Sequence, residues 1–169
     1  MGTIKPFEIK DLKELHELLT SNRWEFFLDP VIDERGLKIR DEKYFSSDTN
    51  QTLVYRDNHE KLLGYIHFDK IENTSIDAPS FTVCVDKSMR GKRIGKDLVK
   101  KGVTYIFDKY NNIRRIYAQT REDNIPMKKT FESLGFRQEA RYKKEWEIRA
   151  TGEYVDTLGY AILREEFKQ

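Results

Sequence analysis

The chain has 169 residues, a length typical of one domain, and its charges nearly cancel, with 31 Lys and Arg against 29 Asp and Glu. This balance excludes a basic tail that coats nucleic acid and an acidic solvating tail. The 10 Phe, 9 Tyr and 2 Trp favour a packed core, because disordered chains are poor in such side chains. We therefore expect a single domain over residues 1–169.

The first half of the chain alternates between helical and strand patterns. Leu12, Leu15 and Leu19 recur at helical spacing and predict a helix from about residue 11 with one apolar face. An aromatic connection over residues 21–30 follows it. The other expected elements are a short strand near residues 3–9, a second helix over roughly residues 33–45, and a hairpin of strands 51–55 and 62–68 around a turn at 57–60.

The second half predicts strands alternating with helices. Pro126 suits the first turn of a helix over about residues 124–134, and Gly135 suits its end. The other expected elements are strands near 80–85, 115–120, 136–148 and 154–163, and a long helix after residue 93. This order predicts a mixed α/β sheet.

One cysteine, Cys84, excludes an internal disulfide and suits a reducing compartment. Together with His16, His59 and His67 it makes no recognisable zinc cluster, so we expect no metal. The first ten residues carry no apolar signal region, and no apolar run approaches the length of a membrane helix. We expect a cytoplasmic protein without membrane or nucleic-acid partners.

Positive charge gathers in one short segment. Residues 90–101 carry a net charge of about +5, whereas residues 1–89 sum to about −5. A tight turn with Gly91 and Gly95 exposes backbone N–H groups, and the helix that follows adds unpaired donors and the positive end of its dipole. With Arg90, Lys92, Arg93 and Lys96 this basic turn, residues 90–96, suits a phosphate. An ordinary strand-to-helix turn with solvated charges is the alternative.

Two motifs carry a family resemblance. The run Arg-Gly-Lys-Arg-Ile-Gly at residues 90–95 resembles the Q/R-x-x-G-x-G/A signature of the GNAT acyl-CoA N-acyltransferases. One helix and one strand later, residues 124–136 resemble the family's N-x-x-A-x-x-x-Y-x-x-x-G-F pattern. The segments 24–30, 152–156 and 160–166 are similar to the ribosomal-protein N-terminal acetyltransferase branch of this family.

The resemblance implies a mostly antiparallel, twisted sheet of about seven strands, with flanking helices and a V-shaped gap between the two central parallel strands. Acetyl-CoA would lie in the gap between strands 80–85 and 115–120. Its pantetheine arm and thioester carbonyl would meet backbone groups at Val83, Cys84 and Val85. The resemblance also implies that the side chain of Asn124 contacts the cofactor, and that Lys129, on an otherwise solvated helix face, reaches toward the 3′-phosphate. The pyrophosphate would bind to Arg90, Gly91, Lys92, Arg93, Ile94, Gly95 and Lys96.

Two positions depart from the family pattern. Arg93 stands at the usual middle glycine, so its side chain must point outward. Phe131 stands where many members have a tyrosine that protonates the departing thiolate, a role that phenylalanine cannot fill. Glu25 and Glu122 are candidates for the general base that the attacking amine needs, although either also suits a solvated surface.

The acceptor side is less defined. Trp24, Phe26 and Phe27 suit either the core or the wall of an acceptor pocket. Cys84 in its strand suits a packed small side chain, and His67 a structural role.

The sequence thus predicts an N-acetyltransferase that moves an acetyl group from acetyl-CoA to a protein N-terminus or a small primary amine. The negative first half favours a cationic acceptor. A non-catalytic acyl-CoA-binding module is the alternative, and a homodimer through the last strands is compatible with both.

Overall fold

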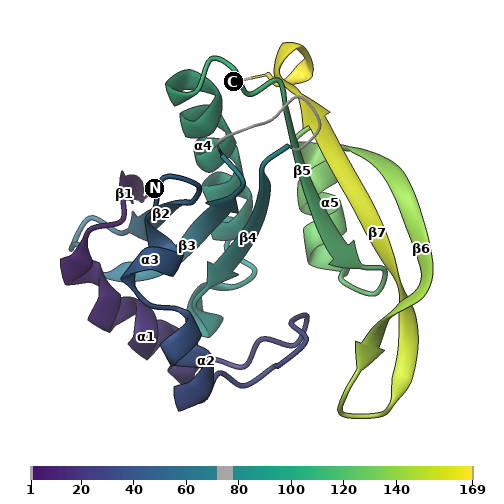
Figure 1. Ribbon diagram of the computed structural model, residues 1–169, viewed down its shortest axis with the longest axis horizontal. Coiled ribbons are helices and arrows are strands. Elements are labelled where there is room, and N and C mark those ends of the chain that lie inside the picture. Colours follow the sequence, from purple (N-terminus) through teal and green to yellow (C-terminus); the bar gives the residue numbers. More distant parts are fainter. Residues whose placement is uncertain (1, 72–77, 169) are drawn as a thin grey trace.

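The computed structural model describes residues 2–71 and 78–168, which form one sheet with helices on both faces (Figure 1). In the described residues the strand order is β1-β2-β3-β4-β5-β7-β6. The strands are β1 (Thr3–Pro6), β2 (Gln51–Arg56), β3 (Leu62–Asp69), β4 (Ser80–Val85), β5 (Arg115–Arg121), β6 (Arg137–Ile148) and β7 (Glu153–Leu163). The helices are α1 (Leu12–Ser21), α2 (Glu34–Ile39), α3 (Glu42–Phe45), α4 (Ile94–Lys109) and α5 (Ile125–Ser133), with single 3₁₀ turns at Ile9–Asp11, Lys87–Met89 and Arg164–Glu166.

The sheet is antiparallel except between β4 and β5, which run parallel. These two strands meet only at Ser80 and Tyr117 and then diverge. Figure 1 shows the resulting opening between the half that carries β1–β4 and the half that carries β5–β7. The expected mixed sheet with a V-shaped gap is therefore confirmed.

Each face of the sheet buries its own hydrophobic cluster. On one face α4 packs Leu98 and Ile106 against β2–β4, within the cluster that also holds Phe131 of α5. Gly102 makes this approach possible, because a Cβ there would lie 2.9 Å from Cγ2 of Ile66. On the other face Leu15 of α1 and other apolar side chains of α1–α3 pack with Cys84 and Val54.

The segment predicted as one helix over residues 33–45 is two short helices, and that prediction is wrong. Asp33 accepts a hydrogen bond from the backbone N–H of Gly36 and caps α2, and Asp41 does the same from Tyr44 and caps α3. A second capping aspartate inside the segment stops one helix and starts another. The first strand is also shorter than predicted, since it ends at Pro6.

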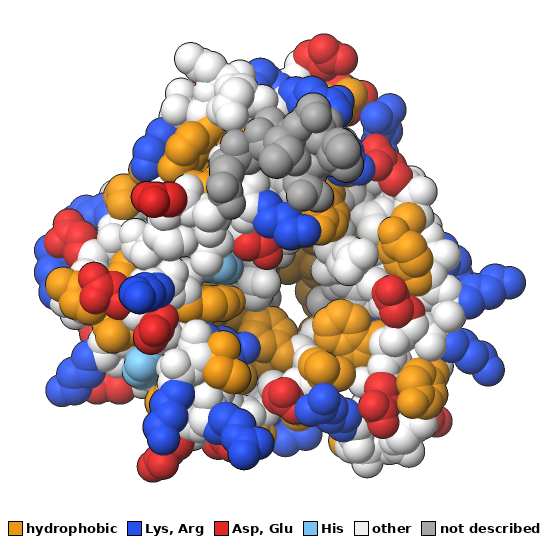
Figure 2. All heavy atoms as spheres, in the orientation of Figure 1, with side chains coloured by type: hydrophobic (Ala, Val, Ile, Leu, Met, Phe, Trp, Pro, Cys, Tyr) orange, Lys and Arg blue, Asp and Glu red, His pale blue; other side chains and the backbone are white. Residues whose placement is uncertain are grey.

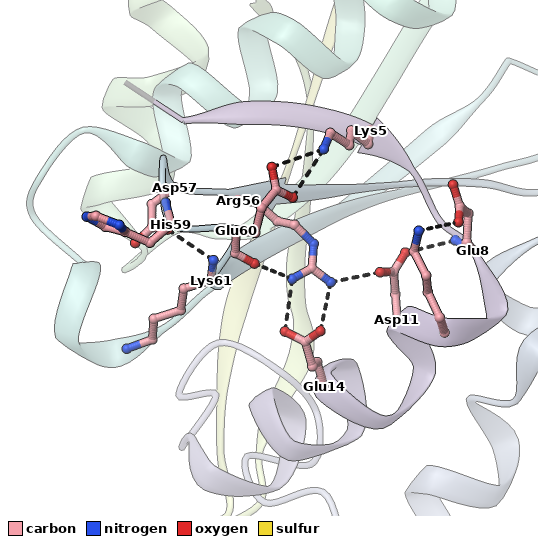
Figure 3. A network of polar contacts seen from close by, with 10 residues as sticks. Lys5, Glu8, Asp11, Glu14, Arg56, Asp57, His59, Glu60 and Lys61 are labelled. Atoms are coloured by element: carbon pink, nitrogen blue, oxygen red, sulfur yellow. Dashed lines mark hydrogen bonds and ion pairs between the residues drawn. The ribbon is translucent and has the colours of Figure 1, made fainter.

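Arg56 ties the β2–β3 hairpin to the start of α1 (Figure 3). Its guanidinium donates to Asp11 at 2.7 Å and to both oxygens of Glu14 at 2.9 Å, and it also donates to the carbonyl of Glu60. Asp11 and Arg56 are both buried. Because a buried charge left without its partner is strongly destabilising, this network holds the N-terminal helix against the sheet.

No helix in residues 2–71 or 78–168 is long and apolar enough to cross a membrane. Within the same residues, no three His, Cys, Asp or Glu side chains gather where they could hold a metal ion.

Candidate active site

The diverging strands leave backbone groups of β4 open toward the gap. Asp86 donates its backbone N–H to Leu63 across the β3–β4 pair, and the direction of N–H groups alternates along a strand. The N–H and C=O groups of Val83 and Val85 therefore point away from β3, toward β5. Since β5 pairs with β4 only at Ser80 among the described residues, β5 leaves these groups open, and they form a polar edge inside the gap at which only the carbonyl of Val85 is engaged, by Nε of Arg90.

A cavity of about 410 Å³ adjoins this edge. We call it the acceptor cavity. Figure 2, in the orientation of Figure 1, shows the molecule opened at this place and bordered by hydrophobic side chains. The lining residues are Phe26, Phe27, Leu28, Asp29, Arg40, Tyr44, Tyr65, Phe81, Thr82, Val83, Gln119, Thr120, Asn124, Met127, Phe131 and Trp146.

The aromatic loop, residues 22–33, forms one wall of the cavity. Phe26 and Phe27 line it, whereas Trp24 is buried in the core, where its indole N–H donates to the carbonyl of Leu19 at 2.9 Å. Trp24 is thus a core residue that supports Phe27 by stacking at 5.6 Å, and the interpretation of Trp24 as a pocket wall is corrected.

Arg121, at the end of β5, fastens the aromatic loop across the gap. Its Nη1 donates to the carbonyl of Glu25 at 2.9 Å, and its guanidinium lies over the ring of Phe26 at 5.3 Å. Asp123 pairs with the same side chain at 2.5 Å. No local pattern in the sequence indicates this contact, because the partners are 96 positions apart.

In the basic turn Gly91 lies in the left-handed region, with φ of +77°, a conformation that favours glycine. Arg93 also lies in the left-handed region, with φ of +65°, directly before α4, and its side chain is exposed as expected. Gly95 lies on the first turn of α4, where an added Cβ would be 3.8 Å from Val85. The turn therefore forms despite the arginine at the usual glycine position.

Arg90 is held by the protein itself. Its Nε donates to the carbonyl of Val85 at 3.2 Å and its Nη2 to the carbonyl of Arg23 at 3.1 Å, and its guanidinium lies over the Trp24 ring at 5.1 Å. This side chain links the basic turn to the aromatic loop. Its predicted contact with the pyrophosphate would have to coexist with these bonds.

Lys92, Lys96 and Ile94 line a second cavity of about 560 Å³, between the start of α4 and the β2–β3 turn. Arg93 borders the same cavity. The positive charge of the segment is therefore concentrated at the N-terminal end of α4, where backbone donors and the helix dipole already favour an anion.

Asn124 caps α5 at the edge of the acceptor cavity. Its Oδ1 accepts from the N–H of Met127 at 3.3 Å, and its Nδ2 donates to Oγ1 of Thr120 at 3.0 Å. These bonds fix the amide beside the gap. Lys129 lies on the exposed side of α5 and does not line the cavity.

Neither candidate base lies at the cavity wall. Glu25 is exposed on the aromatic loop. The carboxylate of Glu122 accepts from Arg141 at 2.8 Å and from the backbone N–H of Asp156 at 3.3 Å, so it joins β5 to the β6–β7 hairpin. Their assignment as bases stays a prediction that the cavity lining does not support.

Cys84 and His67 are buried and structural. Burial raises the pKa of the Cys84 thiol to about 12, so the side chain is a neutral packing group. Burial lowers the pKa of His67 to about 4, while its Nδ1 shares a hydrogen bond with Thr52 at 2.8 Å and its ring stacks on Tyr44 at 4.3 Å.

Several cavity residues were not found from the sequence. Arg40 and Tyr44 come from the α2–α3 pair, and Gln119 and Trp146 come from β5 and β6. Burial raises the pKa of Tyr44, so its phenol stays protonated. The indole N–H of Trp146 is buried and has no hydrogen-bond partner in the described part of the chain. Nothing local in the sequence marks these positions, because only the tertiary fold brings them together.

Phe131 lines the cavity from α5 and is almost completely buried. It contacts Phe81, Phe136 and Tyr160, with ring centroids 4.8–6.0 Å apart. The position therefore supplies an aromatic wall and no proton donor.

The chain matches the model of the acetyltransferase (GNAT) family over residues 12–136 and belongs to this family. It is accordingly an acetyl-CoA-dependent N-acetyltransferase, with acetyl-CoA as co-substrate and a primary amine as acceptor.

Similar solved structures agree with this fold. A spermidine N-acetyltransferase from Vibrio cholerae, in complex with CoA and spermine, is 23% identical with a TM-score of 0.83 and covers 98% of this chain and 96% of its own. Mutant forms of the spermidine/spermine N-acetyltransferase SpeG from the same organism are 22% identical with a TM-score of 0.77, at the same coverage. No curated protein sequence gives a significant match.

Proposed function

We propose that the chain acetylates a small primary amine that binds in the acceptor cavity, while the thioester of acetyl-CoA lies against the backbone edge of β4. The backbone N–H groups of Val83 and Val85, which β5 leaves open next to a cavity of about 410 Å³, are the observation that carries the proposal. Backbone N–H groups aimed into a gap stabilise the negative charge that develops on a thioester oxygen during attack.

The cofactor side follows from the same geometry. The N–H groups of the basic turn and the first turn of α4 would bind the pyrophosphate, with the cations at residues 92, 93 and 96 nearby. The amide of Asn124 would hold the pantetheine arm from the α5 side. In the reaction, the neutral amine nitrogen forms a bond to the thioester carbon, the C–S bond breaks, and the nitrogen loses one proton while CoA leaves as a thiol.

The proton from the amine does not need a carboxylate at the cavity wall. The described lining offers the phenols of Tyr44 and Tyr65 as neutral donors, and burial raises the pKa of both. Tyr44, which is less buried, can protonate the departing thiolate, the role that Phe131 cannot fill. Water in the open gap then accepts the amine proton.

The size of the cavity, about 410 Å³, favours a small acceptor over a protein N-terminus. Polyamines are one candidate class, because the solved structures similar to this chain include enzymes named for spermidine and spermine. We also expect the chain to act in the cytoplasm. A homodimer is compatible with β6, an edge strand of 12 residues with mostly exposed side chains.

A thiol-release assay with acetyl-CoA tests the function. The panel holds simple monoamines, diamines, spermidine, amino acids, amino sugars and short peptides, and we expect turnover on at least one small amine. If CoA binds and no acceptor in the panel, peptides included, is acetylated, the non-catalytic acyl-CoA-binding module becomes the better account.

A further inference from the structure

The charged side chains at the acceptor cavity are few, and they differ in whether an oppositely charged group pairs with them. In the described lining they are Asp29 and Arg40. Asp29 forms an ion pair with Arg149 of the β6–β7 hairpin, so its charge is already balanced. Arg40 has no carboxylate within 4.0 Å among the described residues. The uncompensated charge at this wall is therefore positive.

Arg40 is held in place by contacts that leave most of its guanidinium available. Its Nη1 donates to the carbonyl of Gly36 at 3.0 Å, and its Cζ lies 5.9 Å from the centre of the Tyr44 ring. Its backbone carbonyl is bonded to Nε2 of His16 at 2.8 Å, which fixes the junction between α2 and α3. A guanidinium has five N–H donors, so one bond to a backbone carbonyl leaves enough for a planar anion.

A half-buried cation that no described carboxylate neutralises makes the cavity a poor site for a second positive charge. Like charges brought together in a partly desolvated site repel, and desolvation strengthens the repulsion. Asp69 accepts a hydrogen bond from the hydroxyl of Ser80 at 2.7 Å and does not line the cavity. The negative sum over residues 1–89 does not describe this wall, because Asp29 is the one carboxylate of the described part of that segment that lines the cavity, and others are paired, as in the Arg56 network of Figure 3.

We propose that the amine acceptor carries a carboxylate, which Arg40 binds while the amino group faces the thioester. This inference rests on the proposed function and specifies its substrate class: an amino acid or a similar short amino carboxylate, in place of a polyamine. Arg40 matches a carboxylate with two parallel hydrogen bonds, a geometry that also orients the substrate.

The test compares acceptors of equal length that differ only in the far end group. Each set contains an ω-amino carboxylic acid, its uncharged carboxamide and the corresponding diamine, over chains of three to six carbons, with spermidine as an additional polyamine. We expect the wild-type kcat/KM to be highest for the carboxylate and lowest for the diamine. The chain length that gives the highest kcat/KM then reports the distance from Arg40 to the thioester.

Three variants assign the preference to Arg40. Arg40→Gln is expected to lower kcat/KM for the carboxylates by about tenfold to hundredfold, with little change for the carboxamides. Arg40→Lys, which keeps the charge and loses the planar fork, is expected to recover part of the loss. Lys38→Gln is the matched control, because Lys38 is exposed on the same helix and does not line the cavity.

Three outcomes overturn the inference while the proposed function stands: a wild-type preference for diamines or spermidine, an equal loss on all acceptors in Arg40→Gln, or a loss confined to the KM of acetyl-CoA. The last would mean that Arg40 binds a phosphate of the cofactor. If nothing is acetylated, the proposed function fails first. The role of Arg40 can then still be tested by calorimetry, which measures the affinities of the N-acetylated carboxylate and carboxamide in the presence of CoA. Equal affinities contradict the role of Arg40.

Discussion

Among single residues, buried His67 makes the stability of the chain depend on pH. Burial holds its pKa at about 4 in the folded chain, against 6.5 for an exposed imidazole, so the unfolded chain binds an extra proton between these values. The free energy of unfolding therefore decreases as the pH falls through 6.5 toward 4. We expect this group alone to lower it by about 2 kcal/mol between pH 7.5 and pH 5.0.

Urea unfolding at the two pH values measures the effect. His67→Gln can keep a polar contact to Thr52 without titrating, so its loss between pH 7.5 and 5.0 should be smaller than that of the wild type by this amount. Exposed His59 provides the control, and His59→Gln should retain the wild-type dependence. Equal pH dependence in the wild type and His67→Gln would show that the imidazole is not desolvated as described.

Cys84 provides an independent check on the core between the sheet and α1–α3. A thiol with a pKa near 12 carries almost no thiolate at pH 8, and only the thiolate reacts with disulfide reagents. We expect the native chain to react with such a reagent more than about a hundredfold slower than a free thiol, and the chain in denaturant to react at once. Labelling at an ordinary rate, measured without acetyl-CoA, would place Cys84 at an open surface.

At the scale of elements, the basic turn combines backbone strain at Arg93 with the cofactor contact that we propose for the same residue. A non-glycine residue in the left-handed region is strained by about 1 kcal/mol. Glycine relieves that strain, but it also raises the conformational entropy of the unfolded chain, which offsets part of the gain. We expect Arg93→Gly to be as stable as the wild type or up to about 1 kcal/mol more stable, and to raise the KM for acetyl-CoA several-fold.

Arg93→Ala separates the two effects, because it removes the cation and keeps the strained backbone. Its KM for acetyl-CoA should rise as much as that of Arg93→Gly, without the gain in stability. An unchanged KM in both variants would mean that this charge does not meet the cofactor.

The aromatic loop depends on Arg121 for its position. Arg121→Gln removes the cation from the Phe26 ring and weakens the bond to the carbonyl of Glu25, so the acceptor wall should loosen. We expect the KM for the acceptor to rise about tenfold and the affinity for CoA to change little, as measured by kinetics and calorimetry. Arg115→Gln, on the same strand and away from the loop, is the control; an equal effect there would point to a general loss of stability.

These elements also show what the sequence could reveal. Strand β4 was predicted at its observed limits, because its β-branched and aromatic residues end at a charged turn. The break between α2 and α3 was missed, since Asp41 reads as one more polar residue until it is seen to cap a helix. Arg90 has the side chain of a phosphate ligand, yet its bond to the carbonyl of Arg23, 67 positions away, appears only when distant segments meet. Local patterns therefore located the basic turn, whereas the placement of Arg40 and Tyr44 at the cavity required the fold.

At the scale of the whole molecule, the two halves of the sheet pair directly at one bridge in the described residues, between Ser80 of β4 and Tyr117 of β5 (Figure 1). The hydrophobic cluster that α4 and α5 share, and the contacts of Arg121 and Arg149 with the aromatic loop, also join the halves. A cofactor bound in the gap as we propose would contact both halves and supply hydrogen-bond partners to the open N–H groups of β4. Because a ligand that binds only the folded chain stabilises it by mass action, CoA at a hundred times its Kd should add about 2.7 kcal/mol to the free energy of unfolding.

Amide hydrogen exchange locates this stabilisation. The N–H groups of Val83 and Val85 face the gap, whereas the alternate N–H groups of Thr82 and Cys84 face β3. Without cofactor, the first pair should exchange faster than the second, and CoA should slow the first pair most. Pantetheine, which lacks the pyrophosphate, should protect the same two amides more weakly while leaving the basic turn unprotected. Protection by CoA that is confined to the basic turn would mean that the pantetheine arm does not enter the gap.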